Sequence, residues 1–467
     1  MAEETAPQSE TQPKPAAHPI AAAIDRFVHR ARDTKLAARQ HLPLASSVVG
    51  ARFEKIKSDV ERLVPMLKSG DRPTAVVAQK ELTLVLQRFE RFRNSDVPGA
   101  IEVGLYLSLF AAFDAFVGDL LRAIYTRKPQ LFGSINRQLS FSDVLAAPSL
   151  DALKEQVLDE DIEALRRKSY PDQFAQLATR FDIKLTGFDR WPDFVERSQR
   201  RNLLTHCDGI VSEQYLNTCR EHGVASEKLP SEGTQLGLGP DYFFDACELV
   251  LEVGVKLGQT LWRKTLPEEL SDADEHLMML AYDTLTSRIW ARGRMLGAFA
   301  MSQRQYSSEW KRRAMLVNYV QALKRSGAPE EAMRILQSVD WSAAGHEFCL
   351  ADLVLRDKYD EAATLMRRVG SSDSTLTANA YHTWPLFLEF RETDFFAAAY
   401  RDVFGHAYVS KLEQDAAKAA EGAAAEAKKQ EDASAEVDAA LARDVPPLLE
   451  AAAPESEPNS TLSSGEA

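Results

Sequence analysis

The sequence predicts an all-α protein with more than one domain. Its 467 residues are about two to three times the usual domain length, so we expect at least two hydrophobic cores. Hydrophobic residues make up 45% of the chain and charged residues 27%, and Val, Ile and Thr do not gather in alternating runs. Several long stretches instead repeat apolar residues at helical spacing, which favours helices over strands.

Composition divides the chain into four parts. Residues 1–20 are acidic, rich in Pro, Gln and Thr, and unlike a secretory signal, so they predict a disordered lead-in. Residues 21–266 carry the longest amphipathic stretches and predict a helical bundle. Residues 267–410 have shorter stretches, typical of a helical, repeat-like scaffold or short irregular α-solenoid. Residues 411–467 form an acidic, Ala- and Glu-rich tail that we expect to be disordered.

The helices of the bundle can be placed in order. Residues from about 20 to 94 predict helices, with a new start at Arg72-Pro73 after a Gly-Asp turn. Residues 100–128 predict the most apolar helix, which ends before Pro129 and should be central to the bundle. Further helices are expected within residues 150–177, 188–206 and 241–266.

Residues 267–410 show a weak internal similarity. SGAPEEAMRIL (326–336) matches RDKYDEAATLM (356–366) at a period of 30, and RETDFFAAAYR (391–401) follows at an offset of 35. In this alignment three alanines fall where paired helices can approach closely: Ala332, Ala362 and Ala397. The pattern resembles tetratricopeptide-like repeats, but its signature is degenerate, so irregular helical hairpins are the alternative.

The charge and the cysteines of the chain indicate which binding partners and which cellular compartment to expect. A net charge of −13 argues against a nucleic-acid partner, but residues 411–467 hold thirteen acidic and five basic residues, so the tail carries −8 and the rest only −5. The most apolar stretch, residues 102–121, contains Asp114 and Asp119, which would be costly in lipid, so we expect no membrane contact. Four cysteines without paired spacing predict neither disulfides nor a metal site and fit a cytoplasmic protein.

The candidate site lies in the segment RNLLTH, residues 201–206. On a helix that turns about 100° per residue, three polar residues share one face: Asn202, Thr205 and His206. Arg201 lies at the edge of this face, whereas Leu203 and Leu204 point to the other side and can supply core contacts. Polar groups of this kind are costly in a core, because each needs a partner, and they suit a phosphate site.

These side chains could cleave RNA without a metal or cofactor. An imidazole such as His206 can act near neutral pH as general base on a ribose 2'-hydroxyl. Arg201 could hold the phosphate and offset its developing charge, and Asn202 could orient either group. Attack by the 2'-hydroxyl would leave a 2',3'-cyclic phosphate and a 5'-hydroxyl. One histidine per chain must serve as base and acid in turn, unless a homodimer brings two copies together.

By spacing alone, a solvated Arg–His pair is the commoner outcome, but the surrounding sequence adds to the pattern. ERSQRRNLLTHCDGIVSEQYL (196–216) resembles the last catalytic helix and following turn of HEPN domains, where Arg, a polar residue often Asn, three variable residues and His follow one another. LFAAFDAFVGDLLRAIYTRKPQLF (109–132) is similar to an early HEPN helix in the branch that includes the RiboL-PSP-HEPN proteins. The resemblance covers about residues 52–264 and implies a HEPN-type bundle with catalytic Arg201 and His206, supported by Asn202.

Weaker candidates surround the motif. Arg197, Arg200 and Thr205 could bind RNA phosphates, although a solvated basic face explains the two arginines equally well. Asp114 and Asp119 are weak candidates for an acidic partner of the site, and a structural use of both is the commoner outcome.

Two functions follow from the resemblance. The first is an endoribonuclease used in phage defence or toxin-like growth control, as in many members of the family, with the helical repeats binding a partner protein or antitoxin. The second is a non-catalytic adaptor whose HEPN domain dimerises or binds RNA without cleavage. The intact Arg201 and His206 pair favours the enzyme. The acidic balance favours the adaptor, or a ribonuclease that is slow until triggered.

Overall fold

The computed structural model describes residues 18–135 and 138–409, together with residues 419, 422, 426 and 428. Within this part of the chain all regular structure is helical, apart from one isolated antiparallel bridge between Ile210 and Gln235, so the predicted all-α class is confirmed. Residues 1–17 and most of the acidic tail, both expected to be disordered, lie outside the described residues. The end of the expected lead-in is ordered, because α1 begins at Pro19 and Ile20 is fully buried.

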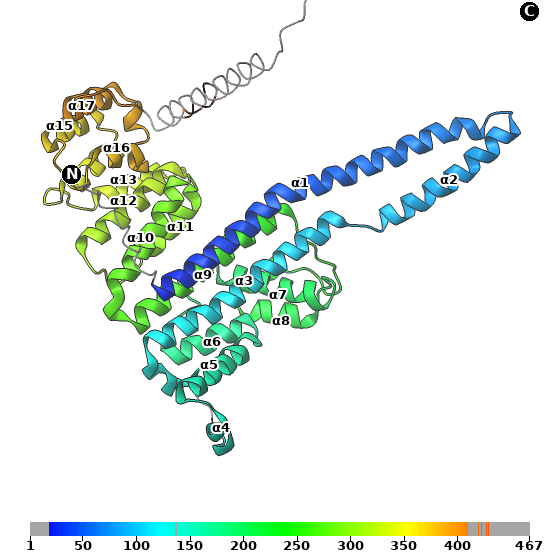
Figure 1. The fold of residues 1–467 in the computed structure, drawn as a ribbon, viewed down its shortest axis with the longest axis horizontal. Helices are drawn as coiled ribbons and strands as arrows, with labels where there is room; N and C mark the ends of the chain where they lie inside the picture. The colour runs from blue at the N-terminus through cyan, green and yellow to red at the C-terminus, as the bar shows by residue number, and fades with distance from the viewer. Residues whose placement is uncertain are drawn as a thin grey trace, which may run out of the picture. The chain divides into compact units, whose positions relative to one another are not determined.

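The chain forms two compact units, Met1–Arg356 and Asp357–Ala467. The helices of the first unit are α1 (Pro19–Leu67), α2 (Arg72–Arg93), α3 (Val97–Arg127), η1 (Pro129–Ser134), α4 (Phe141–Ala146), α5 (Leu150–Arg166), α6 (Tyr170–Phe181), α7 (Trp191–His206), α8 (Glu213–Glu221), η2 (Ser226–Lys228), α9 (Pro240–Thr265), η3 (Pro267–Glu269), α10 (Leu270–Thr286), α11 (Trp290–Met301), α12 (Glu309–Arg325), α13 (Pro329–Gln337) and α14 (His346–Leu355) (Figure 1). Those of the second are α15 (Tyr359–Val369), α16 (Ala378–Thr383), η4 (Pro385–Phe387), η5 (Phe390–Glu392) and α17 (Asp394–Phe404).

Helix boundaries follow the capping residues in the sequence. Asp71 caps α2 by accepting a hydrogen bond from the Thr74 N–H at 3.1 Å, and Asp96 caps α3 through the Gly99 N–H at 2.9 Å. Both helices carry a proline in the first turn, where no N–H is needed. α3 ends just before Pro129, as the sequence predicts.

α1 and α2 form a long antiparallel hairpin (Figure 1). The first half of α1 packs on α3 and α9 and buries side chains from Ile20 to Ala38. The far end of the hairpin has its own small cluster, centred on Leu63, Ala78 and Val85. The hairpin is therefore stabilised by two separate sets of apolar contacts.

The core of the first unit lies where α1, α3 and α9 meet. α3 contacts α1, α5, α7 and α9, in line with its predicted central place. α9 approaches α1 at two glycines: an added Cβ would lie 2.2 Å from Phe27 Cε1 at Gly254 and 2.7 Å from Ile24 Cγ1 at Gly258. The stretch Arg72–Arg127 is long and apolar enough to cross a membrane by length and composition alone, a test that the core helix of a soluble protein can also pass.

The predicted domain boundary after residue 266 coincides with the end of α9 but not with the division into compact units, which falls at Arg356. Charged side chains join the two sides of the predicted boundary. Glu248 of α9 pairs with Arg292 of α11 at 2.8 Å and with Lys35 of α1, and Arg263 of α9 pairs with Asp274 of α10 at 2.7 Å. These largely buried pairs attach α10 and α11 to the bundle. The composition of each segment taken separately does not reveal this attachment.

The predicted 30-residue period is also seen in the turns that precede α13 and α15. Gly327 precedes α13 with φ 85° and Asp357 precedes α15 with φ 60°, so both turns use a left-handed residue. Ala332 and Ala362 are buried, as their alignment predicts. Ala397 is exposed, so the third match is wrong in its register. α17 instead buries Phe396, Ala399 and Tyr400.

Candidate functional site

The first half of α7 is anchored in the core of the bundle. Phe194, Val195 and Ser198 are fully buried, and the ring of Phe194 lies 5.6 Å from that of Phe113 and 5.8 Å from that of Tyr170, measured between ring centres. Aromatic contacts at these distances contribute beyond simple burial. These contacts fix the orientation of α7 and thereby position the motif of residues 201–206 in its second half.

The second half of α7 continues the same face into a cavity of about 350 Å³. Three predicted catalytic residues line this cavity: Arg201, Asn202 and His206. Leu203 turns away from the main core and joins a small cluster with Val211, Tyr215, Leu216 and Cys219. The polar residues of the motif therefore begin where the main core ends. This position explains why they remain accessible from the cavity.

Arg201 is held by its neighbours at one wall of the cavity. Its Nη1 donates to Asn202 Oδ1 at 3.0 Å, and its Nη2 lies 3.6 Å from Asp114 Oδ2 on α3. The Tyr170 hydroxyl donates to the other oxygen of Asp114 at 2.9 Å. Burial raises the pKa of the Asp114 carboxyl, while the hydrogen bond from Tyr170 and the charge of Arg201 oppose that rise. The weakly predicted acidic partner, Asp114, therefore does contact the motif.

His206 occupies the last turn of α7 and is exposed. Its side chain forms no hydrogen bond with the described residues, so one face of the imidazole is open to a ligand in the cavity. Cys207 follows it, is also exposed, and lines the same cavity.

A basic turn that the sequence analysis missed completes the cavity. Arg166 is the last residue of α5, Arg167 and Lys168 come directly after it, and all three line the cavity together with the motif. Arg167 pairs with Glu163, whereas neither Arg166 nor Lys168 forms a side-chain hydrogen bond or ion pair within the described residues. Besides His206, the cavity is thus lined by four basic side chains and one acidic one. Three consecutive basic residues before a capping serine were the available signal.

Arg197 and Arg200 do not line the cavity. The guanidinium of Arg200 lies 4.0 Å from the ring centre of Tyr242, and that of Arg197 lies 4.9 Å from it. Arg197 also pairs with Asp245 of α9. Both arginines are largely buried, at 12% and 16% side-chain exposure, so they orient α7 and are not open to a phosphate in this conformation.

Glu196 is a further residue that the sequence analysis missed. Its Oε1 accepts hydrogen bonds from Arg200 Nε and from the Tyr215 hydroxyl, both at 2.9 Å. Its Oε2 accepts from the Tyr242 hydroxyl at 2.7 Å. A carboxylate with three donors fastens α7 to α8 and α9 and positions the motif from behind.

Two further candidates lie outside the cavity. Asp119 pairs with Arg26 of α1 at 3.0 Å. The hydroxyl of Thr205 donates to the backbone carbonyl of Arg201 at 2.7 Å, and its side chain is exposed. Asp119 is therefore structural, and Thr205 satisfies its hydrogen bond within its own helix.

Within the described residues, no group of three or more His, Cys, Asp or Glu side chains could hold a metal ion. No family model matches the chain, and neither a curated protein nor a solved structure was found to be similar to it. The HEPN resemblance therefore rests on the residues of the chain itself.

Proposed function

We propose that the protein is a metal-independent endoribonuclease of HEPN type. The observation that carries the proposal is that Arg201, Asn202 and His206 line one cavity beside the basic turn of residues 166–168. Positive charge is concentrated there although the chain as a whole carries −13. Such a local excess suits a phosphodiester substrate.

In the proposed reaction the imidazole of His206 takes the proton of a ribose 2'-hydroxyl. The 2'-oxygen attacks the adjacent phosphorus, and the bond from phosphorus to the 5'-oxygen breaks. The imidazolium returns its proton to the leaving 5'-oxygen, so the products are a 2',3'-cyclic phosphate and a 5'-hydroxyl. Arg201 offsets the charge on the non-bridging oxygens, and Asn202 orients Arg201 through their 3.0 Å hydrogen bond.

A homodimer through the bundle is part of this proposal. Each chain supplies one His206, which serves as base and acid in turn in the reaction above; in a two-fold dimer, the His206 of the second copy would supply the acid instead. Light scattering at micromolar concentration should then give a dimer mass, and a strict monomer would remove the composite site. We further propose a cytoplasmic role in phage defence or toxin-like growth control, with a partner protein or antitoxin bound by helices within residues 267–410.

The alternative is a non-catalytic adaptor that dimerises or binds RNA. Two features favour it: among the described residues His206 has no hydrogen-bond partner to orient its ring, and the carboxylate of Asp114 lies 3.6 Å from Arg201. A site with these features could hold a phosphate without moving a proton.

One assay distinguishes the endoribonuclease from the non-catalytic adaptor. Wild type, His206→Ala and Arg201→Ala are incubated with tRNA and a mixed RNA pool in EDTA, and the cleavage ends are mapped. His41→Ala, which removes an exposed histidine of α1, is the matched control. Wild type and the control should cleave and leave cyclic phosphates, while each site variant loses activity by about a hundredfold or more.

Other outcomes have distinct meanings. If wild type binds a fluorescent RNA without cutting it, and Arg201→Ala weakens that binding, the adaptor replaces the enzyme. Cleavage that survives both site substitutions would show that the chemistry is not carried by Arg201 and His206. Circular dichroism of each variant establishes that its helices are retained.

A further inference from the structure

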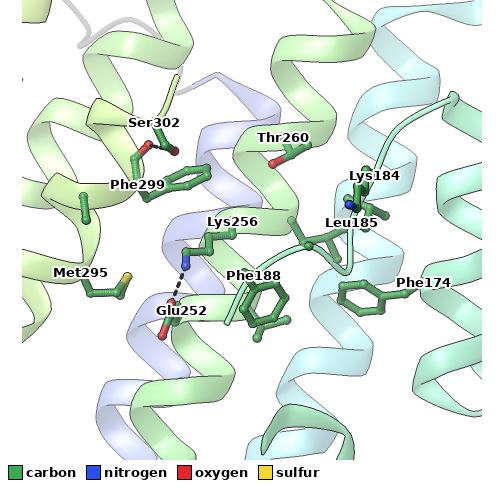
Figure 2. A pocket seen from close by; sticks show the side chains of 14 residues that line it. Phe174, Lys184, Leu185, Phe188, Glu252, Lys256, Thr260, Met295, Phe299 and Ser302 are labelled. Atoms are coloured by element: carbon green, nitrogen blue, oxygen red, sulfur yellow. Dashed lines mark hydrogen bonds and ion pairs between the residues drawn. The ribbon is translucent and has the colours of Figure 1, made fainter. Parts of the chain in front are cut away.

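A second cavity, of about 500 Å³, opens between α9, α11 and the segment that joins α6 to α7. Figure 2 shows three aromatic rings around it, those of Phe174, Phe188 and Phe299, with Lys184 at the edge of the group. The ammonium of Lys256 lies 5.2 Å from the ring centre of Phe188 and pairs with Glu252. This volume is within the usual range of ligand cavities, roughly 300–1,000 Å³, and the lining is mainly apolar.

A more polar cavity of about 680 Å³ adjoins the first. The two share Lys184, Thr260 and Ser302, so together they form one amphiphilic groove. Arg263, Lys264 and Arg304 line the added part. The groove thus has an apolar end surrounded by phenylalanines and a basic end between α9 and the end of α11.

The charges of the groove do not cancel. Five basic and two acidic side chains line it. Three of the basic groups have carboxylate partners, because Lys256 pairs with Glu252, Lys264 with Asp182 and Arg263 with Asp274. The remaining two, Lys184 and Arg304, form no ion pair within the described residues and are exposed. Two uncompensated positive charges at the basic end match a dianion better than a single carboxylate.

We infer that this groove binds a small organic phosphate, a phosphate monoester attached to an apolar group. The apolar group lies among Phe174, Phe188 and Phe299, and the phosphate lies between Lys184 and Arg304. Thr260 lines both cavities, and its hydroxyl is free of hydrogen bonds to described residues, so it can donate to the ester oxygen. The inference is independent of His206 and of the proposed ribonuclease activity.

Calorimetry on the full-length protein tests the inference with defined probes. The titrants are 1-naphthyl phosphate, decyl phosphate below its micelle concentration, 1-naphthol and inorganic phosphate. At least one organic phosphate should bind, with 1-naphthol and inorganic phosphate each weaker by about tenfold or more, since each lacks half of the contacts. Preference for naphthyl over decyl phosphate would indicate a flat ring, and the reverse an alkyl chain.

Variants locate the site. The double change Lys184→Ala with Arg304→Ala should weaken binding of the preferred phosphate by about tenfold or more, and Ala298→Trp should block it by filling the apolar end. Lys228→Ala, which removes an exposed lysine of η2 outside the groove, and His206→Ala should leave it unchanged. Equal affinity in wild type, the double variant and Ala298→Trp, or no binding of either organic phosphate to wild type, would overturn the inference.

Discussion

At the scale of single residues, the arginines of α7 serve two purposes according to the neighbours that they meet. Arg201 faces the cavity and is steered by Asn202 and Asp114. Arg200, one position earlier, is turned by about 100° and stacks on Tyr242 instead. Of these two residues adjacent in sequence, Arg201 therefore belongs to the candidate site and Arg200 to the scaffold that supports it.

Cys207 provides a chemical probe of the cavity. It is exposed beside His206, whereas Cys219 and Cys247 are buried, and burial raises the pKa of each of these two thiols to about 12. Since the thiolate is the reactive form, iodoacetamide at neutral pH should alkylate Cys207 well before those two. Peptide mass spectrometry over time measures the order.

A short RNA in the cavity should slow this alkylation. Cys349, which is half-buried and distant in sequence, serves as an internal control whose rate RNA should not change. Alkylation of Cys207 at the same rate with and without bound RNA would place the RNA elsewhere on the protein.

At the scale of elements, the contact of α9 with α1 depends on a missing side chain. The ring of Phe27 fills the space above Gly254, and it is itself packed against Phe113 and Phe116, with ring centres 5.7 and 4.8 Å away. The ring cannot move aside without disturbing the core. A Gly-x-x-x-Gly spacing at residues 254–258 is the sequence feature behind this close approach.

Gly254→Ala should therefore destabilise the protein by about 3 kcal/mol, the upper end of typical overpacking. Urea unfolding followed by circular dichroism measures the change. The matched control is Gly104→Ala in α3, where nothing lies within 4 Å of the added Cβ. That change should be neutral or slightly stabilising, because alanine favours helix more than glycine does. Equal effects of the two substitutions would contradict the packing argument.

The far end of the α1–α2 hairpin should unfold by itself. Its cluster around Leu63, Ala78 and Val85 is separate from the main core. Leu63→Ala should cost about 2–3 kcal/mol locally. Hydrogen exchange should then rise in α2 and in the end of α1 while amides of α3 and α9 keep their protection. Val48→Ala, at an exposed position on the same helix, is the control, with a change within about 0.5 kcal/mol.

At the scale of the whole first unit, Glu248 connects three helices. Its carboxylate lies on α9 and pairs with Lys35 of α1 and Arg292 of α11. Although burial alone would raise the pKa of Glu248, its hydrogen bonds and charge pairs with Arg292 and Lys35 lower it from 4.5 to about 2. These ion pairs hold α11 against the bundle.

The lowered pKa makes a pH-dependent contribution to stability. A carboxyl whose pKa is depressed by folding stabilises the folded state above its unfolded pKa, and that contribution is lost as the pH falls through the folded pKa. Glu248 should thus contribute roughly 3 kcal/mol at neutral pH, lost between about pH 4.5 and about pH 2. Urea unfolding of wild type and Glu248→Gln across this range measures the difference, which should shrink as the pH falls. A constant difference down to pH 2 would contradict the assignment.

By itself, the sequence determined the all-α class, the capped starts of α2 and α3, the end of α3 before Pro129 and the placing of Arg201, Asn202 and His206 on one helix. These features depend on capping, proline and helical periodicity, which act over a few neighbouring residues.

Only the tertiary structure decided which distant segments share the cavity. The basic turn of residues 166–168 and Asp114 join the motif across more than 30 intervening residues, and Glu196 lies largely buried behind it. The exposure of Ala397 and the attachment of α10 and α11 to the bundle are of the same kind. Local patterns show which face of a helix is apolar, but the neighbour that covers this face is selected by packing between segments far apart in the chain.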